Sequence, residues 1–372
     1  MENTSKKNIN TEEYRAKRAK RRRRNKALTA MGLSGCLILL AVIICLGVRL
    51  WKGADRSTEV SAEVEEITYT QAQLDARLQE AQTQANEQAL QAADERQQEL
   101  LSAIQISLEE GTSVVETLRP YYPGKLVLVS GGKYNFVPIR EDLKHNTYDI
   151  AKLNVLESGE YQYVEDGQVT SHKGIDVSAH QGKIDWQKVA DDGVEFAFIR
   201  VAFRGYGTGK LVEDKYFEDN IKGANKAGIK AGVYVYSQAV TEEELLEEAN
   251  FVLEKIAPYK LDCPVVYDVE KVAGADGRMN NITVEERTRF AVLFCQTMEN
   301  AGYQSMIYHN MEMAAMMVNL EELEPYQKWF AYYNDDFYYP YDYAVWQYSE
   351  KGQVNGVEGN VDLNISFRPL WQ

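Results

Sequence analysis

Short apolar runs of strand length alternate with amphipathic runs of helical length from Gly174 to the end of the chain. Strands that alternate with helices are typical of the α/β class, in which parallel strands share one sheet. Eight apolar runs predict β-strands, at residues 175–179, 196–202, 231–237, 264–270, 305–310, 329–334, 343–348 and 361–365. Five amphipathic runs predict helices, near residues 186–191, 214–227, 241–256, 284–301 and 311–318.

The number of strands indicates how this sheet is closed. Eight strands with fewer than eight helices predict a TIM-like (β/α) barrel with an incomplete helical ring. In such barrels the catalytic residues lie at the C-terminal ends of the strands. Asp176, Glu270, Asn334 and Asp362 all fall near predicted strand ends, so we expect the active site there.

Two carboxylates are paired on the fourth predicted strand. Asp268 and Glu270 are two residues apart, so their side chains face the same way. Cleavage of a glycosidic bond needs a proton donor and an opposing anion or nucleophile. The donor must remain protonated near neutral pH, so burial or neighbouring anions must raise its pKa. The rival interpretation, a chance pair of solvated acids, is disfavoured by the apolar run 264–267 that precedes the pair.

Six segments in this order resemble glycoside hydrolase family 25, the lysozyme-like muramidases. The resemblance extends from about residue 174 to 367. It implies that Glu270 is the general acid, with Asp176, Asp268 and Asp362 as acidic companions. It also implies hydrolysis of the β-1,4 bond between N-acetylmuramic acid and N-acetylglucosamine, with no metal or organic cofactor. The segments are 174–186 (Gly-Ile-Asp-Val-Ser-Ala-His-Gln-Gly-Lys-Ile-Asp-Trp), 267–270, 307–308, 329–331, 345–348 and 361–364.

Aromatic residues crowd the last third of the chain, and aromatic rings pack well against the C–H faces of sugars. Tyr236, Tyr308 and Trp346 occupy strand positions that match the family, and we expect them to contact the substrate. Gln181 and Tyr332 complete the predicted binding set.

One segment departs from the family pattern, and the histidines raise a separate question. Family members often carry His-Phe after the tyrosine of the third strand, where this chain has Ser237-Gln238, so the substrate contacts stay open at this point. His180 and His309 with scattered acids do not predict a metal site.

The N-terminal region predicts a membrane anchor. Residues 1–52 carry 13 Lys and Arg against 3 Asp and Glu, whereas the rest of the chain has a net charge of −25. Residues 27–48 contain no charged side chain, and this uncharged span is long enough for a transmembrane helix. The basic residues 1–26 would then form a cytoplasmic tail, with the C-terminal part extracellular. A cleaved signal peptide is the alternative, but its apolar region is usually shorter. Topology already explains the basic run, so we expect no nucleic-acid partner.

Two regions separate this predicted anchor from the barrel at 173–372. Residues 49–112 predict a helical stalk, read either as a solvated spacer or as a weak dimeric coiled coil. Residues 113–172 predict a small β-rich module, with a hairpin at 125–137 and an Asp166-Gly167 turn. Cys263 and Cys295 are either a disulfide or two buried thiols, and their spacing does not decide between the two.

These observations together predict an enzyme: a muramidase held at the cell membrane, acting on peptidoglycan strands in the cell wall. A catalytically idle wall-binding or scaffolding protein is the alternative, and an enzyme of a chitin-like glycan is a third. The tight spacing of Asp268 and Glu270 favours a substrate-assisted mechanism, and direct attack by Asp176 is the competing one.

Overall fold

The computed structural model describes residues 70–272, 276–334 and 336–371. It begins with helix α2 (Gln71–Glu109), a single exposed helix of 39 residues within the predicted stalk. Within the described ranges no helix is long and apolar enough to cross a membrane. The predicted transmembrane helix at 27–48 and the basic tail at 1–26 lie outside those ranges. The chain divides into two compact units inside α2, and residues 88–372 form the second, to which the following paragraphs apply.

Eight strands of a nine-stranded sheet close into a barrel, because β6, at one end of the strand order, also pairs with β7. The ninth strand, β8 (Leu211–Glu213), is added antiparallel to β7 and is not part of the closed ring. Seven of the strands are parallel, and β14 runs antiparallel to both of its neighbours. The eight predicted strands correspond to these eight, but the reversed direction of the last was not predicted. The strands are β6 (His172–Val177), β7 (Phe196–Arg204), β9 (Lys230–Ser237), β10 (Val265–Val269), β11 (Ser305–Asn310), β12 (Gln327–Ala331), β13 (Val345–Gly352) and β14 (Val361–Ser366).

Alternation along each strand divides the side chains between two cores. One set, which includes Phe198, Tyr234 and Trp329, fills the barrel interior. The other set, which includes Tyr267 and Phe330, packs beneath the helices. Gly174 is required in the interior, because a Cβ there would lie 2.2 Å from the ring of Phe196.

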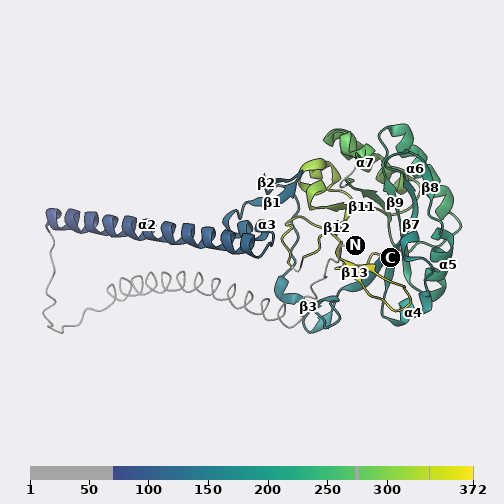
Figure 1. Cartoon of the computed structure of the whole chain (residues 1–372), viewed down its shortest axis with the longest axis horizontal. Coiled ribbons are helices and arrows are strands. Elements are labelled where there is room, and N and C mark those ends of the chain that lie inside the picture. The colour runs from purple at the N-terminus through teal and green to yellow at the C-terminus, as the bar shows by residue number, and fades with distance from the viewer. Residues whose placement is uncertain (1–69, 273–275, 335, 372) are drawn as a thin grey trace, which may run out of the picture. The chain divides into compact units, whose positions relative to one another are not determined.

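The helical ring is incomplete, as the sequence predicts. Figure 1 shows α5, α6 and α7 along the outside of the strands. The described residues between β12 and β13 contain no helix. Helix α7 begins with a full capping box between Thr283 and Glu286. At α6 the box is incomplete, because the Glu244 carboxylate accepts from the backbone N–H of Val240 and not from that of the N-cap residue Thr241. The helices are α4 (Trp186–Asp191), α5 (Phe217–Ala227), α6 (Glu242–Ile256), α7 (Val284–Asn300) and α8 (Leu320–Leu323), with a π-helical turn, η5 (Met313–Met317).

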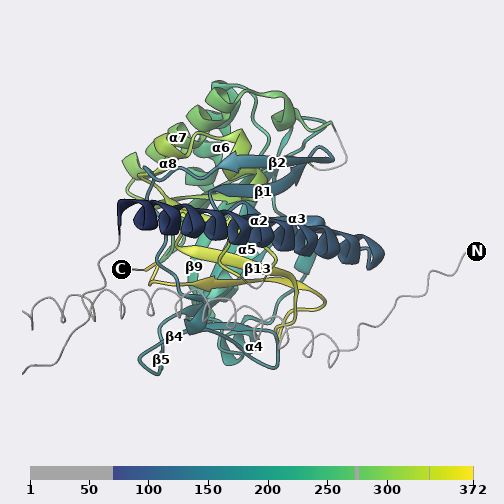
Figure 2. The same cartoon turned by 90° about the vertical axis from the view of Figure 1, so that its left-hand side faces the viewer.

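Residues 113–172 form two small sheets, a two-stranded hairpin and a three-stranded sheet. The hairpin lies on the side of the barrel that carries α7, and the three-stranded sheet lies on the side that carries α4 (Figures 1 and 2). Leu126 of the hairpin and Tyr163 of the other sheet join the core beneath the helices, so neither sheet has a core of its own. The elements are α3 (Val114–Leu118), η1 (Arg119–Tyr121), β1 (Lys125–Ser130), β2 (Lys133–Pro138), β3 (Leu153–Val155), β4 (Tyr161–Glu165) and β5 (Gln168–Val169).

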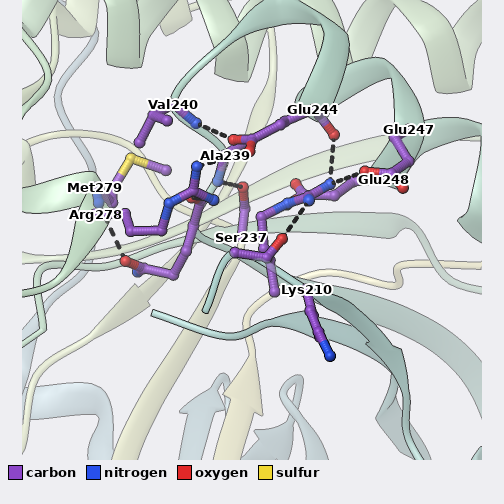
Figure 3. A network of polar contacts seen from close by, with 12 residues as sticks. Lys210, Ser237, Ala239, Val240, Glu244, Glu247, Glu248, Arg278 and Met279 are labelled. Carbon is purple, nitrogen blue, oxygen red and sulfur yellow. Dashed lines mark hydrogen bonds and ion pairs between the residues drawn. The ribbon is translucent and has the colours of Figure 1, made fainter. Parts of the chain in front are cut away.

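A buried polar network joins the end of β7 to α6 (Figure 3). Arg204 is almost fully buried, and its guanidinium donates to the carboxylate of Glu248 at 2.6 Å and to that of Glu247 at 2.7 Å. It also donates to the carbonyl oxygens of Gly209 and Glu244, at 2.7 and 2.8 Å. Burial raises the pKa of Glu248 to about 7, against the opposing effect of Arg204.

Replacement of Arg204 by Met should destabilise the protein by about 3–5 kcal/mol, because Glu248 loses its cation while remaining buried. The pKa of Glu248 would rise further, so the stability lost relative to the native protein should grow as the pH rises above the native Glu248 pKa of about 7. Denaturant unfolding at several pH values measures both effects. Arg289→Met, which removes an exposed ion pair to Glu242, is the matched control and should cost no more than about 1 kcal/mol. A similar loss in both variants would contradict this account.

Candidate active site

A cleft of about 400 Å³ opens at the end of the barrel where the parallel strands terminate. All four predicted acids line it. Asp362 reaches it from the start of β14, because that strand runs in the opposite direction and pairs Asp362 with Asp176 of β6. The lining residues are Asp176, Val177, Ser178, His180, Gln181, Arg200, Tyr234, Tyr236, Asp268, Glu270, Tyr308, Trp329, Tyr333, Gln347, Glu350 and Asp362.

Asp268 and Glu270 form the first carboxyl pair. Asp268 is only 5% exposed and lies between Tyr236 of β9 and Tyr308 of β11 in the strand register, whereas Glu270 is half-buried. The two carboxyls are hydrogen-bonded to each other. Burial is the largest cause that raises the pKa of each, and the negative charge of Glu270 adds to the rise at Asp268. The pair therefore keeps a shared proton at pH values where ordinary carboxyls are ionised.

Asp176 and Asp362 form the second pair. The Asp176 carboxylate accepts hydrogen bonds from the side-chain amides of Gln347 at 2.7 Å and Asn364 at 2.8 Å. Burial outweighs these bonds and raises the pKa of Asp176 to about 6. Burial and the charge of Asp176 raise the pKa of Asp362 to about 8. At neutral pH this pair therefore carries one negative charge and one proton.

A partly buried cation balances part of this negative charge. Arg200 projects from β7 and is held by two bonds of 2.8 Å to the fully buried carboxylate of Asp214. Its charge lowers the pKa of Asp268, although burial and the other acids prevail. Arg200 was not predicted as a site residue, because a lone arginine in an apolar strand carries no distinctive spacing.

Gln347 and Asn364 are two more interior residues at the site that were not predicted. Gln347 accepts hydrogen bonds from the hydroxyls of Tyr308 at 2.8 Å and Tyr333 at 2.9 Å while it donates to Asp176. Asn364 accepts from the indole of Trp329 at 2.7 Å. The alternation of strand side chains is the signal that could have identified Gln347 and Asn364, since both lie on the interior face.

Three of the five predicted binding residues line the cleft. Tyr236 and Tyr308 flank Asp268 from the neighbouring strands. Gln181 also lines it, but its side-chain oxygen accepts from the backbone of Ser178 in a capping box and its amide donates to the carbonyl of Asn360.

Trp346 and Tyr332 do not line the cleft, which corrects the prediction for both. Trp346 is on the outward face of β13, one residue from the inward Gln347, and its ring packs against Tyr161 and Phe337. Its indole donates to the carbonyl oxygen of Tyr332 at 2.7 Å. The hydroxyl of Tyr332 accepts a hydrogen bond from Arg119.

Cys263, Cys295 and His309 do not line the cleft. Cys263 and Cys295 are both free and buried, so they form no disulfide. His309 is fully buried on the outward face of β11, and burial lowers its pKa to about 3. The described residues contain no group of His, Cys, Asp and Glu that could hold a metal ion.

The Ser237-Gln238 departure from the family pattern has a structural role. Gln238 is fully buried, and its amide donates to the Tyr236 hydroxyl and to the Glu270 carbonyl oxygen, both at 3.3 Å. Its oxygen accepts from the backbone of Met279 at 3.2 Å. Gln238 thus joins the end of β10 to the segment that follows it.

The cleft thus gathers two proton-holding carboxyl pairs, and paired carboxyl groups are what cleavage of a glycosidic bond needs. The model of the family "Glycosyl hydrolases family 25" matches residues 175–357. The barrel is therefore a family 25 domain, and the residues before it lie outside the match.

Several known proteins are similar to this chain. The autolytic lysozyme of Clostridium acetobutylicum is 28% identical over 197 residues, which cover 52% of this chain and 55% of the relative. Lysozyme M1 of Streptomyces globisporus is 25% identical over 204 residues, which cover 52% of this chain and 66% of the relative. The structure of a family 25 glycosyl hydrolase from Bacillus anthracis is 26% identical, covers 55% of this chain and 92% of that one, and gives a TM-score of 0.44. The chain thus spans about half the length of the autolytic lysozyme.

Proposed function

We propose that this chain is a muramidase that hydrolyses the β-1,4 bond between N-acetylmuramic acid and N-acetylglucosamine in peptidoglycan. The observation that carries the proposal is the gathering of two carboxyl pairs in one cleft, each with raised pKa values. The lysozymes among the relatives support the choice of substrate.

In the first step Glu270 supplies the proton. The proton shared with Asp268 is held on Glu270 in the reactive complex, which leaves Asp268 anionic. Asp268 orients and polarises the 2-acetamido group of the substrate, whose oxygen attacks the anomeric carbon. The bond from that carbon to the glycosidic oxygen breaks, and the Glu270 proton passes to the leaving oxygen.

In the second step a water molecule attacks the anomeric carbon of the cyclic intermediate. The carboxylate of Glu270 accepts the proton of that water, and the acetamido oxygen is released. In the competing mechanism Asp176 attacks the anomeric carbon directly and forms a glycosyl-enzyme ester. Detection of such an ester by mass spectrometry of the trapped enzyme would overturn the substrate-assisted step.

Digestion of purified peptidoglycan tests the activity itself. The full chain should release fragments with new reducing ends at N-acetylmuramic acid, identified by mass spectrometry. Reducing ends at N-acetylglucosamine would point to a different glycan bond. Wall binding without any release would favour the alternative of an idle scaffolding protein.

The acid pairs predict a bell-shaped dependence of kcat/KM on pH. Activity falls as the pH drops through the pKa of Asp176, about 6, because protonation removes a negative charge that stabilises the positive charge developing at the anomeric carbon. It also falls as the pH rises through the upper pKa of the Asp268 and Glu270 pair, because the donor proton is lost. Asn364→Leu removes a hydrogen bond that lowers the pKa of Asp176. The acid limb of the profile, where activity falls with falling pH, should therefore move to higher pH. An acid limb near pH 4 in the native protein would contradict this assignment.

We further propose that the enzyme is anchored in the cell membrane with the family 25 domain outside. The uncharged span 27–48 and the basic residues before it support this topology. Protease treatment of intact cells should release the acidic C-terminal part, and complete protection of that part would exclude the topology.

A further inference from the structure

The hairpin region before the family match reaches the edge of the cleft. Residues 113–138 contain α3, η1, β1 and β2, and they end well before residue 175, where the match begins. Their side chains nevertheless reach two segments at the cleft. They contact directly the segment after β12, which contains the cleft residue Tyr333, and they reach Lys271, beside the cleft residue Glu270, through Glu312 after β11.

Arg119 makes the first of these contacts. Its guanidinium donates a hydrogen bond to the hydroxyl of Tyr332 and lies 3.7 Å from the ring centre of Tyr338. The Tyr338 hydroxyl also accepts from the backbone of Val127 at 2.6 Å and donates to the carbonyl oxygen of Lys125 at 3.0 Å. The segment after β12 is therefore tied at two tyrosines to η1 and β1.

The segment held in this way carries a cleft residue next to Tyr332. Tyr333 lines the cleft, and its hydroxyl donates to Gln347 at 2.9 Å. Gln347 in turn donates to the Asp176 carboxylate at 2.7 Å. A displacement of Tyr333 would therefore loosen a hydrogen bond that orients Asp176 and stabilises its charged form.

Ser130 makes the second contact, at the end of β1. Its hydroxyl donates to the carboxylate of Glu312 at 2.5 Å, and the same oxygen accepts from the ammonium of Lys271 at 2.7 Å. Lys271 directly follows Glu270 in the chain. The hairpin thus reaches the backbone beside the proton donor through one shared carboxylate.

We propose that residues 113–138 are a positioning element of the cleft. Arg119 fixes the segment that carries Tyr333, and Ser130 fixes Lys271 beside Glu270 through Glu312. Neither residue contacts the reacting atoms, so both act through others. The expected effect on activity rests on the proposed muramidase function, whereas the expected effect on the positions of the two segments does not.

Arg119→Met in the full chain tests the first contact, because Met retains apolar packing on Tyr338 but loses the guanidinium. Hydrogen exchange should become faster at the backbone amide of Tyr332, which donates to the carbonyl oxygen of Gln347. On peptidoglycan, kcat/KM should fall about tenfold, and the acid limb of the pH profile should move to higher pH. Loss of stability alone would not move that limb.

Arg140→Met is the matched control, since Arg140 follows β2 and its guanidinium pairs with the exposed Asp142 and Glu321. It should leave both measurements at native values. Ser130→Ala should speed exchange at the amide of Val272, which follows Lys271 and donates to the side-chain oxygen of Asn280 at 2.9 Å, and should lower kcat/KM about threefold. Ser158→Ala, in the β3–β4 turn, should do neither.

The outcomes separate the two proposals. Native exchange and a native pH profile in Arg119→Met would overturn the positioning role, as would equal effects in Arg140→Met. If the native chain cleaves no glycan, the muramidase proposal fails, while the exchange measurements still decide whether Arg119 and Ser130 hold the two segments.

Discussion

Replacement of Glu270 by Gln should lower kcat on peptidoglycan by about 10³-fold while substrate binding remains near its native value. Gln has nearly the shape of Glu but carries no transferable proton, and general acid catalysis is worth about 10²–10⁴-fold. The half-buried position and hydrogen bond to Asp268 indicate that the change should leave the fold intact. Release of reducing ends gives kcat, and sedimentation with insoluble wall gives binding.

The control for this variant is Glu195→Gln. Glu195 lies just before β7, at the barrel end opposite the cleft, and pairs with His172 on the surface. Its substitution should leave kcat unchanged. If Glu270→Gln kept more than about a tenth of the native kcat, another group would have to be the proton donor.

The barrel was predictable because its strands alternate with helices at regular intervals and end in turn residues. The end of the barrel that carries Asp176, Asp268 and Glu270 also followed from the sequence, since parallel strands bring their C-terminal ends together. Asp362 was placed at the correct end although it starts its strand, because β14 runs antiparallel. The hydrophobic pattern of the sequence indicates that a strand exists but does not indicate its direction in the sheet.

The errors at the site have one common cause. Trp346 was chosen for its chemistry, but the barrel side of β13 is occupied by its neighbour Gln347. One residue of offset moves a side chain to the other face of a strand. Tyr332 likewise faces Arg119, whereas Tyr333 lines the cleft. A consistent assignment of faces from Asp268 and Tyr308 across the neighbouring strands would have corrected both.

Residues 113–172 show a different limit of sequence reasoning. Their strands and the Asp166-Gly167 turn were predictable, and Asp166 has a φ of 48° and Gly167 a φ of 79°, as such a turn requires. Their separation into two sheets was not, because it depends on contacts more than 180 residues away, such as Val127 with Tyr338. Local patterns do not encode contacts of that range.

Asp268→Asn should lower kcat by about 10²–10³-fold, because an amide cannot supply the negative charge that polarises the acetamido group in the proposed first step. It should also move the alkaline limb of the pH profile to lower pH. Without the neighbouring charge, Glu270 loses the repulsion that raises the upper pKa of the pair, and the introduced side-chain amide would stabilise the Glu270 anion.

A comparison with Asp176→Asn distinguishes the two mechanisms. If the acetamido group is the nucleophile, an electron-poor N-trifluoroacetyl substrate should react much more slowly with the native enzyme, and neither variant should accumulate a glycosyl ester. If Asp176 is the nucleophile, the acetamido substitution should matter little and Asp176→Asn should be the less active variant. The burial of Asp268 between Tyr236 and Tyr308 favours the first outcome, because a charge at that position is poorly screened and acts strongly on a nearby amide.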